Sequence, residues 1–330
     1  MKRPLRTLFY GMSHEHAPGK IATLRKLTDD FEVVAIADDT ARHSPSFHNM
    51  KFDASGYRVV PESEALQISD IEVVFVETAN RDLMEIAGVY AERGIAMHCD
   101  KPCGEAMEPY RSIVEKCRAK NVPFQIGYMY RGNPALKWIW KFVAEGGLGD
   151  VRFIEADMNH DYQASGYEEY LATFKGGILY NLGCHLVDTV LPMVRGGFVA
   201  ANPVLGVTSG SSTLRFEGTD VLIRTSAYMP GGVLCRRLRV DGTKGTIDLC
   251  PIERFDGKRL TLKLSAGETV KEMDFGVQTD RYADQLLDLA AIVRGEKPND
   301  QDYDRDLKTH EMTLKACGLQ ILHDLHVLHG

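Results

Sequence analysis

Short, nearly continuous apolar runs alternate with helix-like stretches over residues 1–128, and this alternation restricts the possible folds more than any other feature. Runs rich in β-branched residues form strand candidates at Leu5–Tyr10, Glu32–Asp38, Tyr57–Val60, Ile71–Thr78, Ile95–Cys99 and Val122–Tyr128. Helix candidates between them are Gly19–Leu27, Asp82–Arg93 and Met107–Lys120. Strands without polar alternation are typical of a parallel sheet covered by helices on both faces. The pattern therefore predicts a doubly wound α/β domain with a parallel sheet.

The second part of the chain has a different pattern. Val151–Asn159 predicts a long strand, and Tyr180–Arg195 predicts a helix. Segments of alternating polarity, separated by glycine-rich turns, then fill residues 204–275 and predict an open, mainly antiparallel sheet. Two further helices are expected at Arg281–Arg294 and Arg305–Leu328. This part therefore predicts an α+β domain.

Length and charge narrow the possible classes of function. At roughly 150 residues per domain, a chain of 330 residues suggests two domains, which we place at 1–128 and 129–330. The formal net charge of −7 gives no basic excess for binding nucleic acid. No apolar run approaches the ~20 residues of a membrane span, and the N-terminus lacks a signal-peptide core. Seven cysteines without a C-x-x-C pair suit a reducing compartment, so we expect a cytoplasmic protein.

The turn at residues 11–16 follows the first expected strand and precedes a helix. Its sequence, Gly11-Met12-Ser13-His14-Glu15-His16, occupies the position of the dinucleotide fingerprint G-x-G-x-x-G. Gly11 matches the first glycine, Ser13 is a small residue at the second, and His16 replaces the third. We expect a dinucleotide to contact Gly11, Met12, Ser13, His14 and His16. The alternative is an ordinary turn with two incidental histidines.

Asp38 ends the second expected strand, where an acidic side chain can accept hydrogen bonds from a ribose 2′-hydroxyl. Asp39 follows it, and two carboxylates would repel a 2′-phosphate, which favours NAD over NADP. Arg42 and His43 lie close enough in the sequence to keep NADP open. The alternative role for Asp38 is that of a helix-capping carboxylate.

Polar residues also follow later strands. Thr78 and Asn80 come after the fourth expected strand, and Lys101 comes after the fifth. Ligands bind outside the carboxyl ends of such strands, and a lysine there can polarise a hydroxyl or carbonyl oxygen. Asn181 and His185 are four residues apart on an expected helix, so they project from one face. His185 can exchange a proton with a substrate hydroxyl, and the alternative is a satisfied histidine of the core.

Five short motifs, in order along the chain, resemble those of the Gfo/Idh/MocA family. They are Thr78-Ala79-Asn80, Gly94–Pro102, Gly127–Pro134, Gly146–Val151 and Gly176–Asp188. The second motif ends in Asp100-Lys101-Pro102, where the family has E-K-P, and the fifth resembles G-G-x-x-x-[DN]-x-G-x-H-x-x-D. Asn181 stands where aspartate is the commoner residue. The motifs extend over essentially the whole chain.

The resemblance implies an N-terminal Rossmann-type domain and NAD(P)-dependent oxidation of a hydroxyl on a sugar, polyol or sugar derivative. It implies that His185 accepts the hydroxyl proton, that Lys101 holds and acidifies the hydroxyl, and that Asn181 orients the substrate or His185. It also implies homodimers or homotetramers that form through the open sheet, and one cleft shared by Lys101 and His185. Two alternatives remain, namely an NAD-cycling glycosidase or lyase and a non-catalytic dinucleotide sensor.

Four residues are expected near the substrate. Tyr130 and Arg131 lie in the motif that enters the second domain, and Tyr162 lies in an aromatic, polar segment ahead of the expected catalytic helix. Asp188 ends the fifth motif. The alternatives are a structural salt bridge for Arg131, an exposed loop around Tyr162, and a structural role for Asp188.

We expect no metal site. His310, His323, His326 and His329 crowd the last expected helix, but no acidic or cysteine partner accompanies them at metal-site spacing.

Overall fold

The computed structural model describes residues 3–42, 52–162 and 166–319. The chain forms two compact units. Unit 1 contains the residues up to Tyr128 together with Tyr282–Lys308, and unit 2 contains Met129–Arg281 and the residues from Thr309 onward. Segment 282–308 therefore packs in unit 1, whereas the sequence analysis placed it in the second domain. The chain passes between the units within helix α9 (Tyr303–Ala316).

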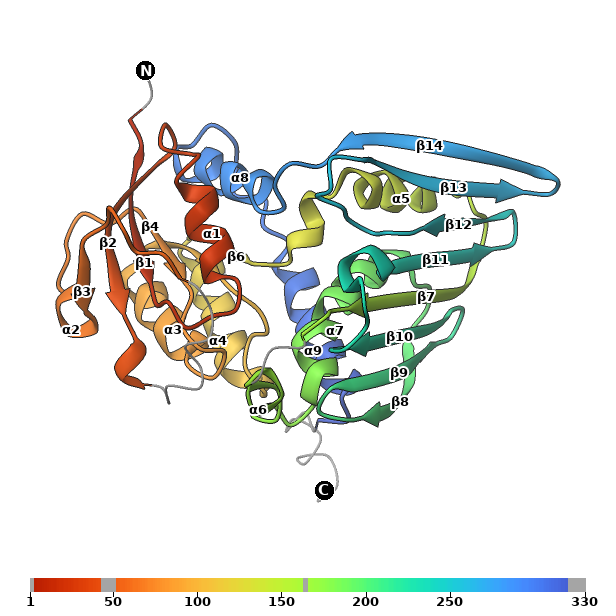
Figure 1. Cartoon of the computed structure of the whole chain (residues 1–330), viewed down its shortest axis with the longest axis horizontal. Coiled ribbons are helices and arrows are strands. Elements are labelled where there is room, and N and C mark those ends of the chain that lie inside the picture. Colours follow the sequence, from red (N-terminus) through yellow and green to blue (C-terminus); the bar gives the residue numbers. More distant parts are fainter. Residues whose placement is uncertain (1–2, 43–51, 163–165, 320–330) are drawn as a thin grey trace. The chain divides into compact units, whose positions relative to one another are not determined.

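Unit 1 is built on a six-stranded parallel sheet with the order β3-β2-β1-β4-β5-β6 (Figure 1). Its strands are β1 (Leu5–Tyr10), β2 (Phe31–Asp38), β3 (Val59–Pro61), β4 (Val73–Val76), β5 (Ala96–Cys99) and β6 (Phe124–Ile126). Its helices are α1 (Ala17–Leu24), α2 (Glu62–Ala65), α3 (Leu83–Arg93), α4 (Met107–Ala119) and α8 (Ala283–Val293). This strand order is that of the Rossmann fold, so the predicted doubly wound sheet is confirmed.

The central strands of this sheet are buried on both faces. Every residue of β4 and β5 is buried, as expected for the continuous apolar runs of the sequence. The strand order reverses between β1 and β4, so the carboxyl ends of these two strands flank the switch point where ligands bind in folds of this kind. The sheet therefore brings the turn after β1 next to the residues that follow β4.

Unit 2 contains an eight-stranded sheet with the order β14-β13-β12-β11-β7-β10-β9-β8. The strands are β7 (Val151–Asn159), β8 (Phe198–Leu205), β9 (Ser209–Phe216), β10 (Asp220–Ser226), β11 (Arg237–Gly242), β12 (Gly245–Leu249), β13 (Arg259–Ala266) and β14 (Thr269–Val277). Strand β10 pairs in parallel with β7, and the other neighbours are antiparallel. The predicted mainly antiparallel sheet is therefore confirmed.

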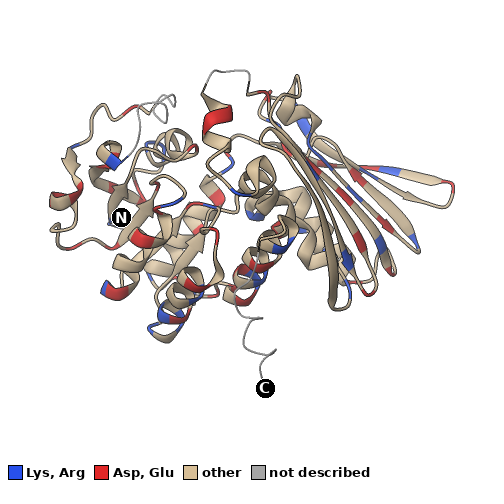
Figure 2. Ribbon diagram, turned by 90° about the horizontal axis from the view of Figure 1, so that it is seen from below, with Lys and Arg blue, Asp and Glu red and all other residues tan. Residues whose placement is uncertain are grey.

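Helices cover part of this sheet and leave charged side chains exposed on it. Helix α7 (Gly177–Val190) packs on β7, β9 and β10, and α5 (Pro134–Ala144) packs on β13. Strands β9 and β10 alternate buried and exposed residues. Figure 2 shows acidic and basic positions interspersed along the strands of the large sheet. We call the side of the sheet that carries these charges the open face.

Several helices differ from their expected bounds, and α1, expected at Gly19–Leu27, lies at Ala17–Leu24. Helix α7 begins three residues before the expected Tyr180 and ends at Val190 instead of Arg195. Helix α9 begins at Tyr303, and the end of the helix expected at Arg305–Leu328 lies outside the described residues. Within the described ranges, no helix is both long and apolar enough to cross a membrane.

Candidate active site

The turn after β1 requires glycine at its first position. Gly11 has φ +98°, and a Cβ placed on it would lie 2.6 Å from the Thr78 backbone nitrogen and 2.8 Å from the Glu77 carbonyl oxygen. A side chain here would collide with the backbone at the end of β4. The His14 N–H donates to the Glu77 carbonyl oxygen at 3.0 Å and holds the turn against that strand. The fold thus explains why the first glycine of the fingerprint is kept.

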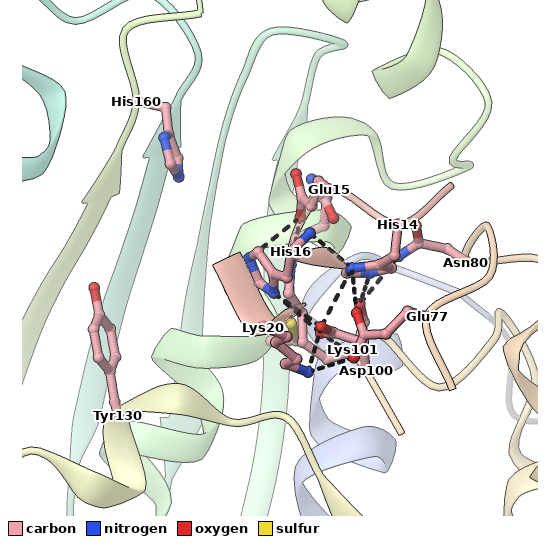
Figure 3. A network of polar contacts seen from close by, with 12 residues as sticks. His14, Glu15, His16, Lys20, Glu77, Asn80, Asp100, Lys101, Tyr130 and His160 are labelled. Atoms are coloured by element: carbon pink, nitrogen blue, oxygen red, sulfur yellow. Dashed lines mark hydrogen bonds and ion pairs between the residues drawn. The ribbon is translucent and has the colours of Figure 1, made fainter. Parts of the chain in front are cut away.

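The residues after Gly11 join a cluster of charged and polar side chains, which we call the buried network (Figure 3). It consists of His14, Glu15, His16, Lys20, Glu77, Asp100 and Lys101, whose side chains are 0–11% exposed. These residues come from the turn, from α1 and from the ends of β4 and β5. The network ties the turn to the carboxyl edge of the sheet.

His14 is a neutral hydrogen-bonding link in this network. The His16 N–H donates to His14 Nδ1 at 3.1 Å, so the ring proton lies on Nε2 and donates to the Lys101 carbonyl oxygen at 2.9 Å. Burial lowers the pKa of His14 to about 4. Asn80 Nδ2 also donates to the Lys101 carbonyl oxygen, at 3.1 Å. The backbone at Lys101 is therefore held by side chains from the turn and from the segment after β4.

Lys20 supplies the positive charge in the centre of the network. Its Nζ lies 2.6 Å from Asp100 Oδ2 and 2.8 Å from Glu77 Oε1. Burial alone would lower the pKa of Lys20, but these two carboxyl groups raise it. Burial also opposes ionisation of Asp100, yet its pKa lies well below the usual range because His14, Lys20 and His16 surround it. Burial raises the pKa of Glu77 well above its usual value, so one of the two acids carries the charge.

Lys101, the lysine of the D-K-P motif, makes an ion pair with Glu15. Its Nζ lies 2.7 Å from Glu15 Oε1, and the two side chains are 0% and 5% exposed. Burial would raise the pKa of Glu15, but the Lys101 ammonium and the neighbouring histidines hold it well below its usual range. The sequence analysis omitted Glu15 from the expected cofactor contacts. Its position in the turn could have indicated a role in the site, but the dinucleotide fingerprint assigns no function to that position.

Asp38 and Asp39, at the end of β2, accept hydrogen bonds from two different parts of the backbone. Asp39 is buried, and its Oδ1 accepts from the Met12 N–H at 2.8 Å, which shapes the turn. Asp38 is half-buried, and its Oδ1 accepts from the Thr40 N–H at 2.9 Å. Asp38 therefore caps the 3₁₀ turn η1 (Thr40–Arg42) at the end of the strand, the alternative considered from the sequence. Arg42 pairs with Glu62 and Glu85, and His43 lies outside the described residues.

Three members of the network are close enough together to hold a metal ion. One ligand atom each from His14, His16 and Asp100 lies within 4.8 Å of the others. These atoms already have partners, because His14 Nδ1 accepts from the His16 N–H and Asp100 Oδ2 faces the Lys20 ammonium. A metal ion here would have to displace Lys20. The ammonium is thus the cation that balances Asp100.

In unit 2, helix α7 carries Asn181 and His185, and both are fully buried. The helix begins at Gly177, whose φ is +54° and where a Cβ would lie 2.3 Å from the Gly206 carbonyl oxygen. The second glycine of the motif thus allows α7 to start against the backbone next to β9. The ring of Tyr130 packs against that of His185 with centroids 5.7 Å apart. The structure therefore brings together His185 and one expected substrate residue.

Arg131 and Asp188 pair with each other. Arg131 Nη2 lies 2.6 Å from Asp188 Oδ1, and Arg131 Nε lies 3.1 Å from both carboxylate oxygens. The Thr309 hydroxyl also donates to Asp188, at 3.3 Å. This geometry matches the alternative structural salt bridge. The fifth motif thus ends in a residue that ties α7 to the segment entering unit 2.

Tyr162 belongs to a chain of aromatic rings. It stacks on His160 at 4.1 Å between centroids and on Tyr167 at 3.7 Å. The chain continues through Tyr170, Phe174 and Tyr180, where it reaches α7. Residues 163–165 lie outside the described residues.

Arg236, a fully buried charge of unit 2, was not among the site residues expected from the sequence. Arg236 is 0% exposed, and it contacts Tyr130, His160 and Glu253. These residues are far apart in the sequence, and only Tyr130 belongs to one of the five motifs. Their spacing in the sequence therefore does not predict that their side chains contact one another.

Comparison with known proteins agrees with the fold. Residues 137–248 match the GFO/IDH/MocA C-terminal domain. Levoglucosan dehydrogenase of Pseudarthrobacter phenanthrenivorans is 27% identical over 185 residues, which are 54% of this chain and 44% of that protein. D-apiose dehydrogenase of Paraburkholderia graminis is 23% identical over 181 residues, 54% of this chain and 46% of that protein. The chain therefore matches less than half the length of these two curated relatives.

A solved structure matches over nearly the whole chain. It is KijD10, a 3-ketoreductase from Actinomadura kijaniata in complex with NADP and TDP-benzene. The TM-score is 0.75 at 16% identity, over 94% of this chain and 96% of that chain. Residues 137–248 thus match the C-terminal domain of the Gfo/Idh/MocA family, and the fold of the chain is similar to that of KijD10.

Proposed function

We propose that the protein is an NAD(P)-dependent dehydrogenase that oxidises a hydroxyl group of a sugar, polyol or sugar derivative, with NAD preferred. The match to the GFO/IDH/MocA C-terminal domain supports oxidoreductase chemistry, and the matched relatives include dehydrogenases named for levoglucosan and D-apiose. The substrate is thus a small hydroxylated molecule. The physical argument rests on the site itself.

The observation that carries the proposal is the contact between the turn after β1 and Lys101. Glu15 of the turn lies 2.7 Å from the Lys101 ammonium. A dinucleotide bound at a Rossmann turn has its pyrophosphate at the start of the following helix. The proposed cofactor loop and the proposed hydroxyl-binding lysine therefore share one edge of one sheet.

The residues of unit 1 fit a dinucleotide. Gly11 provides a close backbone approach that no side chain could allow. Asp38 uses Oδ1 to accept from Thr40, and its position at the end of β2 suits a ribose hydroxyl. Arg42, four residues after Asp38 in the sequence, already pairs with Glu62 and Glu85. The Asp38 carboxylate would repel a 2′-phosphate, and Arg42 is already paired with two carboxylates. The site therefore favours NAD over NADP.

The bound nicotinamide would supply the hydride acceptor, and the chain's own residues manage the proton. Lys101 holds the substrate hydroxyl and stabilises the negative charge that develops on its oxygen. His185 accepts the hydroxyl proton, and Asn181, one helical turn earlier, orients the substrate or His185. Asn181 carries no charge, so it orients without adding an electrostatic partner. Tyr130 packs on the His185 ring and restricts its orientation.

The test is calorimetric titration with NAD, NADH, NADP and NADPH, followed by assays with a panel of sugars and polyols. We expect micromolar binding of NAD and accumulation of NADH with one class of substrate. Turnover without NADH release would instead indicate the NAD-cycling alternative. Binding without any turnover would favour the sensor, and failure to bind any dinucleotide would overturn the proposal.

We further propose a cytoplasmic homodimer or homotetramer that assembles through the open face. Apolar side chains are exposed on and around the strands, among them Phe153, Val199 and Val270. Such surfaces commonly form symmetric interfaces. Light scattering should show a dimer or tetramer at micromolar concentration, and a monomer would contradict the assembly.

A further inference from the structure

Arg236 is a buried charge for which the proposed chemistry has no use. It is the largest fully buried side chain of the described residues. Its Nε donates to the Asn159 carbonyl oxygen at 3.1 Å, and its Nη2 donates to His160 Nε2 at 2.6 Å. Its Nη1 donates to the Tyr130 hydroxyl at 3.3 Å and also to Glu253. One guanidinium thus joins the end of β7 to two separate loops.

A second arginine shares the carboxylate partner of Arg236. Glu253 is the carboxylate partner of Arg236, and Arg281 Nη2 lies 3.1 Å from the same carboxylate oxygen. Two guanidinium groups therefore share one carboxylate. Burying such groups is costly, and a pair of apolar residues would stabilise the fold at least as well. The arrangement suggests a purpose other than stability.

The contact with His160 determines the form of that imidazole. Arginine has no acceptor, so His160 Nε2 must accept and the ring proton must lie on Nδ1. His160 also stacks on Tyr162, which fixes the plane of its ring. Both the tautomer and the orientation of His160 are therefore set by neighbouring groups.

The contact of Arg236 with Tyr130 connects Arg236 to His185, the proposed general base. Tyr130 accepts from Arg236 and donates to Glu253 at 3.5 Å, so its hydroxyl is held from two sides. Its ring packs against His185. Figure 3 shows the Tyr130 hydroxyl and the His160 ring turned toward each other. Arg236 donates to both, so it links the environment of His185 to the aromatic chain that starts at His160.

We propose that Arg236 is a positioning residue, which holds His160 as its Nδ1–H tautomer and holds Tyr130 beside His185 for proton transfer. This inference rests on the proposed function for the part played by His185. The fork of donors is essential to it, because a lysine is a point charge that cannot reach three acceptors in one plane. The substrate thus meets a prearranged pair of side chains, of which His160 can only donate from Nδ1.

The test compares Arg236→Lys with Arg237→Lys. Arg237 is the next residue on β11, and it makes an exposed bidentate pair with Asp248. In protein labelled with ¹⁵N-histidine, the His160 signals (assigned with His160→Gln) should show the Nδ1–H tautomer in the wild type and in R237K. They should show a mixture or the Nε2–H tautomer in R236K. Retention of the Nδ1–H form in R236K would overturn the inference.

The kinetic arm uses a substrate from the panel. We expect R236K to lower kcat about tenfold or more with a smaller change in KM, and R237K to stay within about twofold of the wild type. An altered His160 tautomer with unchanged kcat would also overturn the inference. If R236K does not fold, Tyr130→Phe removes only the hydroxyl held by Arg236. It should lower kcat severalfold and keep the His160 tautomer, and an unchanged kcat would overturn the inference.

The two proposals fail separately. If the wild type oxidises no substrate and binds no dinucleotide, the proposed function fails, while the tautomer measurement still reports on Arg236. If the wild type is an active dehydrogenase and R236K behaves like R237K, only the role of Arg236 fails.

Discussion

The buried network of unit 1 and the open face of unit 2 use the same kinds of charged residues in opposite settings. In the network, Lys20, Asp100 and Glu77 are each 0% exposed. On the open face, Arg224 and Asp157 make a bidentate pair at 2.8–3.0 Å, yet Arg224 is 52% exposed. The N–O distances in the two regions are similar, but the exposure of the side chains to water differs. Water screens the open face and leaves the network unscreened.

This difference in solvent exposure determines how much the ion pairs of each region affect stability. Asp157 is largely buried, but the exposed Arg224 guanidinium can return to water, so this pair contributes less to stability than a fully buried one. The loss of one partner of a buried pair is strongly destabilising, because it leaves the other partner charged and without solvent. The network therefore holds the turn after β1 in one geometry, whereas the ion pairs of the open face contribute little to the stability of the single chain.

The largest effect is expected from Lys20→Met. The substitution leaves Asp100 and Glu77 facing each other without a cation, and we expect a loss of about 3–5 kcal/mol in the free energy of unfolding. Denaturant titration followed by circular dichroism measures it. A loss below about 1 kcal/mol would place the network in the same class as the open face.

His185→Ala tests whether a buried polar group of unit 2 acts in catalysis. We expect kcat to fall about 10²-fold or more, because general-base catalysis typically contributes that much. The melting transition and NAD binding should remain. If His185 and Lys101 act on one hydroxyl, adding Lys101→Met should cost less than the product of the single effects. A His185→Ala rate equal to that of the wild type would mean that His185 is a core histidine.

Asp38→Asn tests the choice of cofactor. Its amide oxygen can still accept from the Thr40 N–H, so the turn is kept while the charge is lost. We expect the preference for NAD over NADP, measured as a ratio of kcat/KM, to fall about tenfold. Asp39→Ala is the matched control, because it removes the hydrogen bond to Met12 and should weaken both cofactors alike. An unchanged ratio in D38N would leave Asp38 as a capping residue only.

Stability should depend on pH through two buried histidines of unit 1. Burial lowers the pKa of His14 to about 4 and that of His98 to about 3. Below pH ~6.5 the unfolded chain binds these protons and the folded chain does not, so stability falls as pH drops from about 6.5 toward 4. Each histidine contributes a slope of up to about 1.4 kcal/mol per pH unit. The raised pKa of Glu77 acts in the opposite direction.

Urea unfolding at pH 7.5, 6, 5 and 4.5 measures this dependence. NMR checks its cause, since the His98 ring signals should stay constant down to pH 5. A His98 midpoint near 6.5 would show that the imidazole is not held neutral by burial.

The smallest effect is expected on the open face. Arg224→Ala should change the free energy of unfolding by less than about 1 kcal/mol, and added salt should reduce the difference further. The matched variant Arg224→Met keeps more of the apolar stem. A loss comparable to that of Lys20→Met would show that the pair of Arg224 and Asp157 is buried inside the interface of the proposed oligomer, whereas a small loss places this pair outside that interface.

Much of the fold could be predicted because it depends on local patterns. The strands Leu5–Tyr10 and Val151–Asn159 have the predicted bounds, since their apolar runs end at turn residues. Segment 282–308 was misplaced because its helix is amphipathic in the same way as any surface helix. Its partner, the Lys20–Asp100 side of unit 1 next to Tyr282, is more than 180 residues away in the sequence.

The sequence by itself determined the parallel sheet, the glycine turn and the motifs that carry Lys101, Asn181 and His185. Local patterns suffice for these, because period, turn chemistry and residue type act over a few neighbours. Only the tertiary structure decided that Glu15 holds Lys101, that Lys20 balances Asp100, and that Arg236 joins Tyr130 to His160. Such contacts depend on where distant strands end in space. A buried charge without a partner is costly, so each of these charges pairs with a residue that the fold places beside it, even one far away in the sequence.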